Sequence, residues 1–121
     1  MAFIKQITLP TGETGDYWRI VEINDHAELG SVVTLQLYKS KALRGQNAQP
    51  LALSLQFVFD LNEIESVDPD ENRSKGWRDV WYHCHYLAIK AASVSGHEKA
   101  DEERTENERK AQVIYGSQDD Y

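Results

Sequence analysis

The sequence has 121 residues, of which 40% are hydrophobic, and its formal net charge is −7 at pH 7. This length predicts a single domain with a packed core. The acidic balance argues against a nucleic-acid partner, because phosphate contacts require clustered Lys and Arg side chains. The longest stretch without a charged residue covers residues 45–59 and is too short and too polar to cross a membrane.

Four segments alternate between apolar and polar residues, as β-strands with one buried face do. They are residues 3–9, 16–24, 31–39 and 51–60. Alternation is cleanest in the fourth, where Leu55 and Phe57 share the apolar face. The second has apolar residues on both faces, with Trp18 and Ile20 opposite Ile23, and so could be covered on both sides. Short connections favour an antiparallel meander.

The apolar spacing becomes helical over residues 75–93, and Gly96 is the expected stop. The main apolar stripe of this helix is expected to face the sheet. It consists of Trp77, Val80, Trp81, Cys84, Leu87, Ala88 and Ala91. We therefore predict a core in which Trp81 and Cys84 meet Leu55 and Phe57.

A second apolar set, Tyr82, Tyr86 and Ile89, lies nearly opposite the main stripe. One sheet cannot cover both sides of the helix. Tyr is enriched at subunit interfaces, so this second set is a candidate contact surface.

Residues 97–112 contain many charges and almost no apolar stripe, which predicts a solvated helical extension or a mobile segment. An apolar patch follows, and it could fold back on the helix or add to a sheet edge of this chain or of another copy. The six candidate interface residues are therefore Tyr82, Tyr86, Ile89, Val113, Ile114 and Tyr115. They would contact one another within one chain or contact another subunit.

These elements predict an α+β fold in which a four-stranded, mainly antiparallel sheet packs against one C-terminal helix. Residues 1–96 form the predicted domain. Residues 97–121 form a charged tail, mobile or helical and solvated.

The triplet His83-Cys84-His85 contains three metal-ligating residue types. On a helix the two His side chains point about 200° apart, so one ion cannot bind both. We expect Cys84 to be buried like a small hydrophobic residue, with the two His at the boundary of the core.

Residues 68–79 resemble part of a calcium-binding loop, with oxygen-bearing side chains at several of the expected positions. Arg73 replaces the required Gly at the sixth position, and the last ligand is Asp79 rather than the longer Glu. The sequence predicts no bound metal and no cofactor.

The sequence contains neither a Gly-x-Ser-x-Gly elbow nor a phosphate-binding Gly loop. We predict that the protein is not an enzyme. An enzyme whose site forms between subunits is the alternative in this class.

Three segments resemble small proteins of tailed bacteriophages and prophages that belong among the tail or tail-fibre genes. They are MAFIKQITLPTG at residues 1–12, YWRI at 17–20 and LYKSKA at 37–42. The helical segment 86–90 is similar to a Tyr-x-x-Leu-Lys motif that closes many of these proteins, with Ile89 in place of the Leu. The resemblance covers residues 1–60 and the helix.

The resemblance implies a structural or assembly role in a virion, exerted through protein–protein contacts. The implied partners are other phage tail or virion proteins, with a homo-oligomer as a further option. The implied location is the virion or the cytoplasm of the host bacterium. The alternative function is that of a soluble bacterial domain that binds a small ligand or a carbohydrate.

Overall fold

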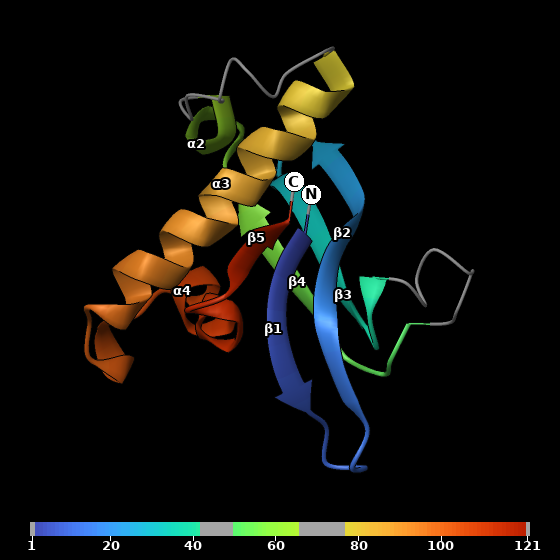
Figure 1. Ribbon diagram of the computed structural model, residues 1–121. Coiled ribbons are helices and arrows are strands. Elements are labelled where there is room, and N and C mark those ends of the chain that lie inside the picture. Colours follow the sequence, from blue (N-terminus) through green and yellow to red (C-terminus); the bar gives the residue numbers. More distant parts are fainter. Residues whose placement is uncertain (1, 42–49, 66–76, 121) are drawn as a thin grey trace.

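The computed structural model describes residues 2–41, 50–65 and 77–120 and has an α+β fold. Its sheet has five strands in the order β4-β3-β2-β1-β5, and every neighbouring pair is antiparallel (Figure 1). The strands are β1 (Ala2–Thr8), β2 (Thr14–His26), β3 (Gly30–Tyr38), β4 (Ser54–Phe59) and β5 (Gln118–Asp120). The helical elements are α2 (Leu61–Glu65), α3 (Trp77–His97), η1 (Asp101–Glu103), α4 (Glu106–Ala111) and η2 (Gln112–Ile114). The four predicted strands are present, and β5 is a fifth strand that the sequence pattern did not predict.

The buried face of the sheet is formed by apolar residues that lie in rows across the strands. Phe3, Trp18 and Leu37 form one such row across β1, β2 and β3, and all three are buried. A bulge between residues 20 and 22 of β2 shifts the alternation by one position. Ile23 therefore packs against the same core as Ile20, not on the opposite face as the strict alternation indicated.

The β2–β3 hairpin closes at Gly30, which has a φ of 90°. A Cβ atom at this position would lie 2.3 Å from the carbonyl oxygen of Phe59. Only glycine combines this backbone conformation with so close an approach. The hairpin can therefore lie flat against the end of β4.

Helices α3 and α4 lie on the same side of the sheet, and α4 packs beneath the C-terminal half of α3 (Figure 1). The side of α3 that enters the core carries Tyr86 and Ile89, both fully buried. The predicted facing stripe was wrong in this respect, because Trp81 is only partly buried and Ala91 is exposed. Cys84 is buried as predicted.

Residues 97–120 belong to the tail that the sequence predicted to be mobile or helical and solvated, and in the structure they are folded and include helix α4 and strand β5. Helix α3 continues past Gly96 to His97, and the chain then turns back through η1, α4 and η2 to end in β5. A Cβ atom at Gly96 would lie 2.6 Å from Nε2 of Gln112 and 2.8 Å from Cβ of Glu108. Gly96 lies in the last turn of α3, one residue before the helix ends, and its lack of a side chain lets α4 pack closely there.

Candidate functional site

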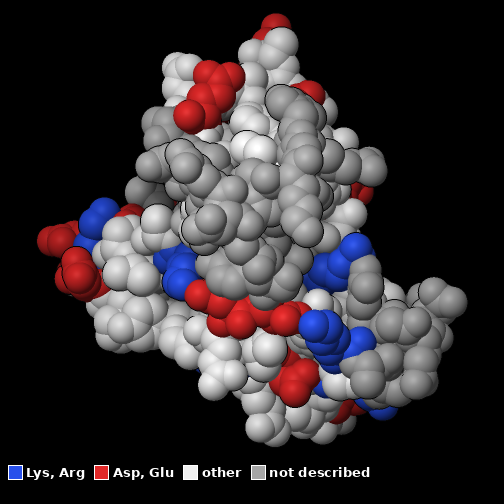
Figure 2. Space-filling model, turned by 45° about the horizontal axis from the view of Figure 1, so that its top comes forward, with Lys and Arg blue, Asp and Glu red and all other residues white. Residues whose placement is uncertain are grey.

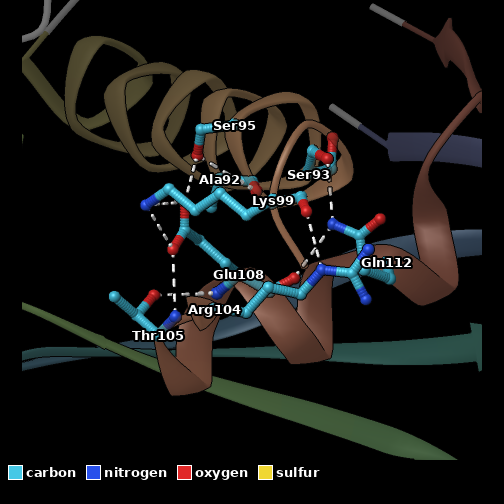
Figure 3. A network of polar contacts seen from close by, with 9 residues as sticks. Ala92, Ser93, Ser95, Lys99, Arg104, Thr105, Glu108 and Gln112 are labelled. Carbon is cyan, nitrogen blue, oxygen red and sulfur yellow. Dashed lines mark hydrogen bonds and ion pairs between the residues drawn. The ribbon is translucent and has the colours of Figure 1, made fainter. Parts of the chain in front are cut away.

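Glu108 fastens α4 to the end of α3 (Figure 3). Its carboxylate accepts hydrogen bonds from Ser95 Oγ at 2.6 Å, Lys99 Nζ at 3.0 Å and the Thr105 backbone N–H at 2.9 Å. The Glu108 N–H donates to Thr105 Oγ1 in return, which completes a capping box at the start of α4. The hydrogen bond from Ser95, followed by those from Thr105 and Lys99, lowers the pKa of Glu108 from 4.5 to about 2.

Two further side chains close the same junction by satisfying carbonyl groups at the C-terminal end of α3. Gln112 Nε2 donates to the carbonyl oxygen of Ser93 at 3.0 Å, and Arg104 Nε donates to that of Gly96 at 2.6 Å (Figure 3). The last four carbonyls of a helix have no partner within the helix, so the Arg104 bond to Gly96 caps α3, and the Gln112 bond adds a second link between the helices. The tail is thus held in a defined position.

Strand β5 covers the edge of β1 and is held there by charged side chains. Asp119 accepts hydrogen bonds from the Tyr86 hydroxyl and from Lys90, both on α3. Asp120 forms an ion pair with Lys41, with Nζ and Oδ2 3.0 Å apart. Acidic side chains flanked by basic ones are also visible on this side of the molecule in Figure 2.

The two carboxylates of β5 remain charged although part of their surface is covered. Burial by itself raises the pKa of Asp119, but the hydrogen bonds from Lys90 and Tyr86 bring it below its ordinary value. The hydrogen bond from Lys41 lowers the pKa of Asp120. Strand β5 is therefore held in place through two charged carboxylates.

The opposite edge of the sheet, at β4, is covered by side chains of α4. Asn107 Nδ2 donates to the carbonyl oxygen of Val58 at 2.8 Å, and the Val58 N–H donates to Asn107 Oδ1 at 3.3 Å. Lys110 Nζ donates to the carbonyl oxygen of Gln56 at 2.8 Å. The tail thus occupies both edges of the sheet in one chain.

The six residues predicted to form an interface lie on elements that pack together within the chain. Tyr86, Ile89 and Ile114 are buried in the core of this chain. The partly buried ones are Tyr82, Val113 and Tyr115. The Tyr115 ring stacks on that of His97, with centroids 3.7 Å apart. The segment that adds to the sheet edge is β5, not residues 112–115.

A polar cluster joins the β2–β3 hairpin to α3, and within it Ser31 and His85 are buried whereas Asp25 is exposed. Ser31 Oγ lies 2.7 Å from Asp25 Oδ1 and 2.6 Å from His85 Nε2. His85 Nδ1 donates to the Trp81 carbonyl at 2.7 Å, and Trp81 Nε1 donates to Asp25 Oδ2 at 3.0 Å. Burial, the largest influence, lowers the pKa of His85.

This cluster contains the residue types of a hydrolase triad but differs from one in arrangement and access. In a triad the carboxylate binds the second imidazole nitrogen, whereas here the Trp81 carbonyl does so. Ser31 and His85 are both 0% exposed, so neither side chain can reach a substrate. The cluster acts as a structural clamp.

The triplet around Cys84 is more deeply buried than predicted, because His83 and His85 lie in the interior with it and not at the core boundary. Within the described ranges, no three His, Cys, Asp or Glu side chains are arranged to hold a metal ion. The calcium-like segment 68–79 lies outside the described residues, apart from the start of α3. In the part of the chain that is described, no helix has the length and apolar character needed to cross a bilayer.

The face of the sheet opposite α3 carries an uncharged patch on the neighbouring strands β3 and β4, which we call the open face. It consists of Val32, Thr34, Gln36, Gln56 and Val58. Val58 is 48% exposed, and the other members are exposed or half-buried. The chain as a whole carries a net charge of −7, but this patch has no charged side chain. Charged residues are also depleted at the centres of protein interfaces, so the patch has the composition of an interface.

Two shallow hollows are present among the described residues. The larger, of about 300 Å³, lies beside the β2–β3 turn and is lined by Ala27, Glu28, Gly30, Asp60, Leu61 and Asn62. The smaller, of about 230 Å³, lies between α3 and the segment before β5. The polar lining of the larger hollow could hydrogen-bond a small polar ligand.

The sequence analysis missed the residues that attach the tail, namely Glu108, Asn107 and Lys110. One signal for α4 was present, because Thr105 and Glu108 have the spacing of a capping box. The contacts of Asn107 and Lys110 carry no local signal, because their partners on β4 lie 49 and 54 residues away.

Comparison with protein-family models, with curated proteins and with solved structures gave no match for this chain. The fold and the surface described above are therefore the basis for a functional proposal.

Proposed function

We propose that this chain is a structural or assembly protein of a phage or prophage, associated with the tail and acting through protein–protein contacts. Its partners are other tail or virion proteins, and it resides in the virion or in the cytoplasm of the host bacterium. The resemblance of residues 1–60 to small phage tail proteins supports this proposal, since those residues include β1 to β4 and the open face.

The observation that carries the proposal is the open face itself. Among the described residues, helices α3 and α4 cover one side of the sheet and the tail occupies both edges, so the open face is a surface available to a partner (Figure 1). An uncharged patch with an exposed Val58 fits another protein better than a small molecule.

The test is incorporation into phage particles made by a host that carries the gene. We expect the chain to copurify with intact virions in a fixed ratio to a tail protein, as measured by quantitative mass spectrometry. Val58→Glu should strongly reduce incorporation, because it places a charge in the open face.

Val94→Glu is the matched control. Val94 is also 48% exposed but lies on α3, away from the open face, so this variant should be incorporated normally. Absence of the wild-type chain both from purified virions and from complexes with tail proteins in the host lysate would contradict the proposal. Equal incorporation of the two variants would show that the open face is not the contact surface.

A second candidate function, binding of a small ligand or carbohydrate, is favoured by the hollow beside Asp60 and Asn62. Carboxylate and amide groups of this kind hydrogen-bond sugar hydroxyls. Titration with a panel of sugars, followed by amide chemical shifts, tests it. Saturable shifts at Gly30 and Asn62 that disappear in Asn62→Ala would favour this function, and an unchanged spectrum would exclude it for the panel.

A further inference from the structure

Strand β4 has the composition of a self-pairing segment. Its sequence, SLQFVF, contains six residues with no charge, no Pro and no Gly. Short segments with high β-propensity and low charge pair readily with a copy of themselves when they form an exposed sheet edge. In this chain β4 is the last strand on one side of the sheet, and only side chains of α4 cover its outer edge among the described residues.

The contacts of α4 on β4 reproduce those of a neighbouring strand. The side-chain amide of Asn107 both donates to and accepts from the backbone of Val58, as a residue of a paired strand does. Lys110 occupies the next outward carbonyl, that of Gln56. Side chains thus hold positions that backbone groups of a sixth strand could fill.

The other edge of the sheet does not suit a second copy. Strand β5 is three residues long and contains Asp119 and Asp120, so two such edges would repel each other. Natural sheets use short length and charge to prevent pairing at an edge. Of the two edges in the described part of the chain, β4 is therefore the one that is covered by side chains of another element.

We propose that side chains of α4 reversibly block the outer edge of β4 and that β4 is the edge at which a second copy of this chain joins to extend the sheet. The two β4 strands would pair antiparallel about a two-fold axis, so that the groups of Val58 and Gln56 now bound to α4 bond their counterparts in the partner. Such an isologous contact closes on itself and gives a dimer. The inference deepens the proposed function by naming a surface and a partner, and its test needs only the purified chain.

The test removes the contacts of α4 with the β4 backbone by the double substitution Asn107→Ala and Lys110→Ala. We expect the molar mass, measured by light scattering after size exclusion, to double with rising concentration while the wild-type chain stays at the lower mass. Hydrogen exchange should show the Val58 amide protected in the dimer and unprotected in the dilute variant. Adding Val58→Lys to the double variant should restore the monomer, because it brings like charges into the joined edge.

Arg109→Ala is the matched control, since Arg109 is exposed on the same helix and pairs with Asp101 instead of β4. This variant should have the mass of the wild-type chain. A double variant that stays monomeric with a native circular-dichroism spectrum would overturn the proposal, as would association that leaves the Val58 amide unprotected.

If the double variant unfolds, the single substitution Asn107→Ala can be used instead, because it keeps the Lys110 contact and unblocks only part of the β4 edge. It removes both hydrogen bonds to Val58 and should show the same concentration-dependent change at a higher concentration. A constant mass for this folded variant would also overturn the proposal. Failure of the virion experiment would leave the dimer measurements unaffected, so the two proposals are tested separately.

Discussion

The ring of Phe3 in β1 stacks on the ring of Tyr86 in α3, with centroids 4.3 Å apart and planes inclined by 16°. The Tyr86 hydroxyl donates to Asp119 in β5. One side chain of the helix therefore contacts both the first and the last strand of the sheet. This position explains why the Tyr86 side of α3 is the side that enters the core.

We predict that Tyr86→Ala lowers the free energy of unfolding by about 3–5 kcal/mol, because it leaves a cavity beside Phe3. Trp81→Ala should cost less, since Trp81 is only partly buried. Tyr86→Phe keeps the ring and should cost about 1.5–3 kcal/mol for the lost hydrogen bond to a charged group. Urea denaturation gives this order, and a larger loss for Trp81→Ala would show that the other side of α3 faces the sheet.

Gly96→Ala should destabilise the protein by about 1–3 kcal/mol because the added methyl group collides with α4. In an exposed helix the same change would stabilise by about 1 kcal/mol, so the sign of the effect reports the packing. Thermal unfolding measures it, with Val94→Ala as an exposed control of small effect. A higher midpoint for Gly96→Ala would mean that α4 does not pack closely there.

The attachment of α4 should weaken in acid. The pKa of Glu108 in the folded chain, about 2, is below its ordinary value of 4.5, so the unfolded chain binds the proton more tightly. The stability from this carboxylate is complete above pH 4.5 and is lost as the pH falls toward about 2. The difference in melting temperature between the wild-type chain and Glu108→Gln should shrink across that window, whereas parallel curves would contradict the assignment.

Ser31→Ala should lower the free energy of unfolding by about 1–3 kcal/mol, because it leaves Nε2 of the buried His85 without its hydroxyl partner and removes the hydrogen bond to Asp25. Thr34→Ala is the control, since the Thr34 hydroxyl makes only a long, exposed contact of 3.4 Å with Gln56. Chemical denaturation compares the two. Equal, small effects of the two substitutions would show that the hydrogen bonds of Ser31 contribute little to the free energy of unfolding.

Much of the sheet followed from local pattern. Alternating residues such as Leu35 and Leu37 in β3 predict strands with one buried face, and the short hairpin connections predict antiparallel neighbours. The change to helical spacing near residue 75 predicts α3. These features depend on residues close together in the chain, so the sequence reports them directly.

The orientation of α3 did not follow from pattern, because the helix has apolar residues on two sides. The hydropathy pattern predicted that the larger stripe, around Trp81, faces the core. In the structure the Tyr86 side of the helix is buried instead, together with His83 and His85, which a hydropathy scale counts as polar. Stacking of Tyr86 on Phe3 and the hydrogen bonds of His85 to Ser31 and to the Trp81 carbonyl offset the cost of burying these side chains.

The sequence by itself determined the four-stranded antiparallel sheet, the main helix and the acidic character of the tail. Only the tertiary structure decided that the tail folds back, adds β5 to one edge and places Asn107 on the other. The physical reason is distance along the chain, since Lys5 bonds the Tyr115 carbonyl across 110 residues and the Asn107 contact spans 49. A charged segment read alone resembles a solvated one, and partners so far away leave no periodic signal in its sequence.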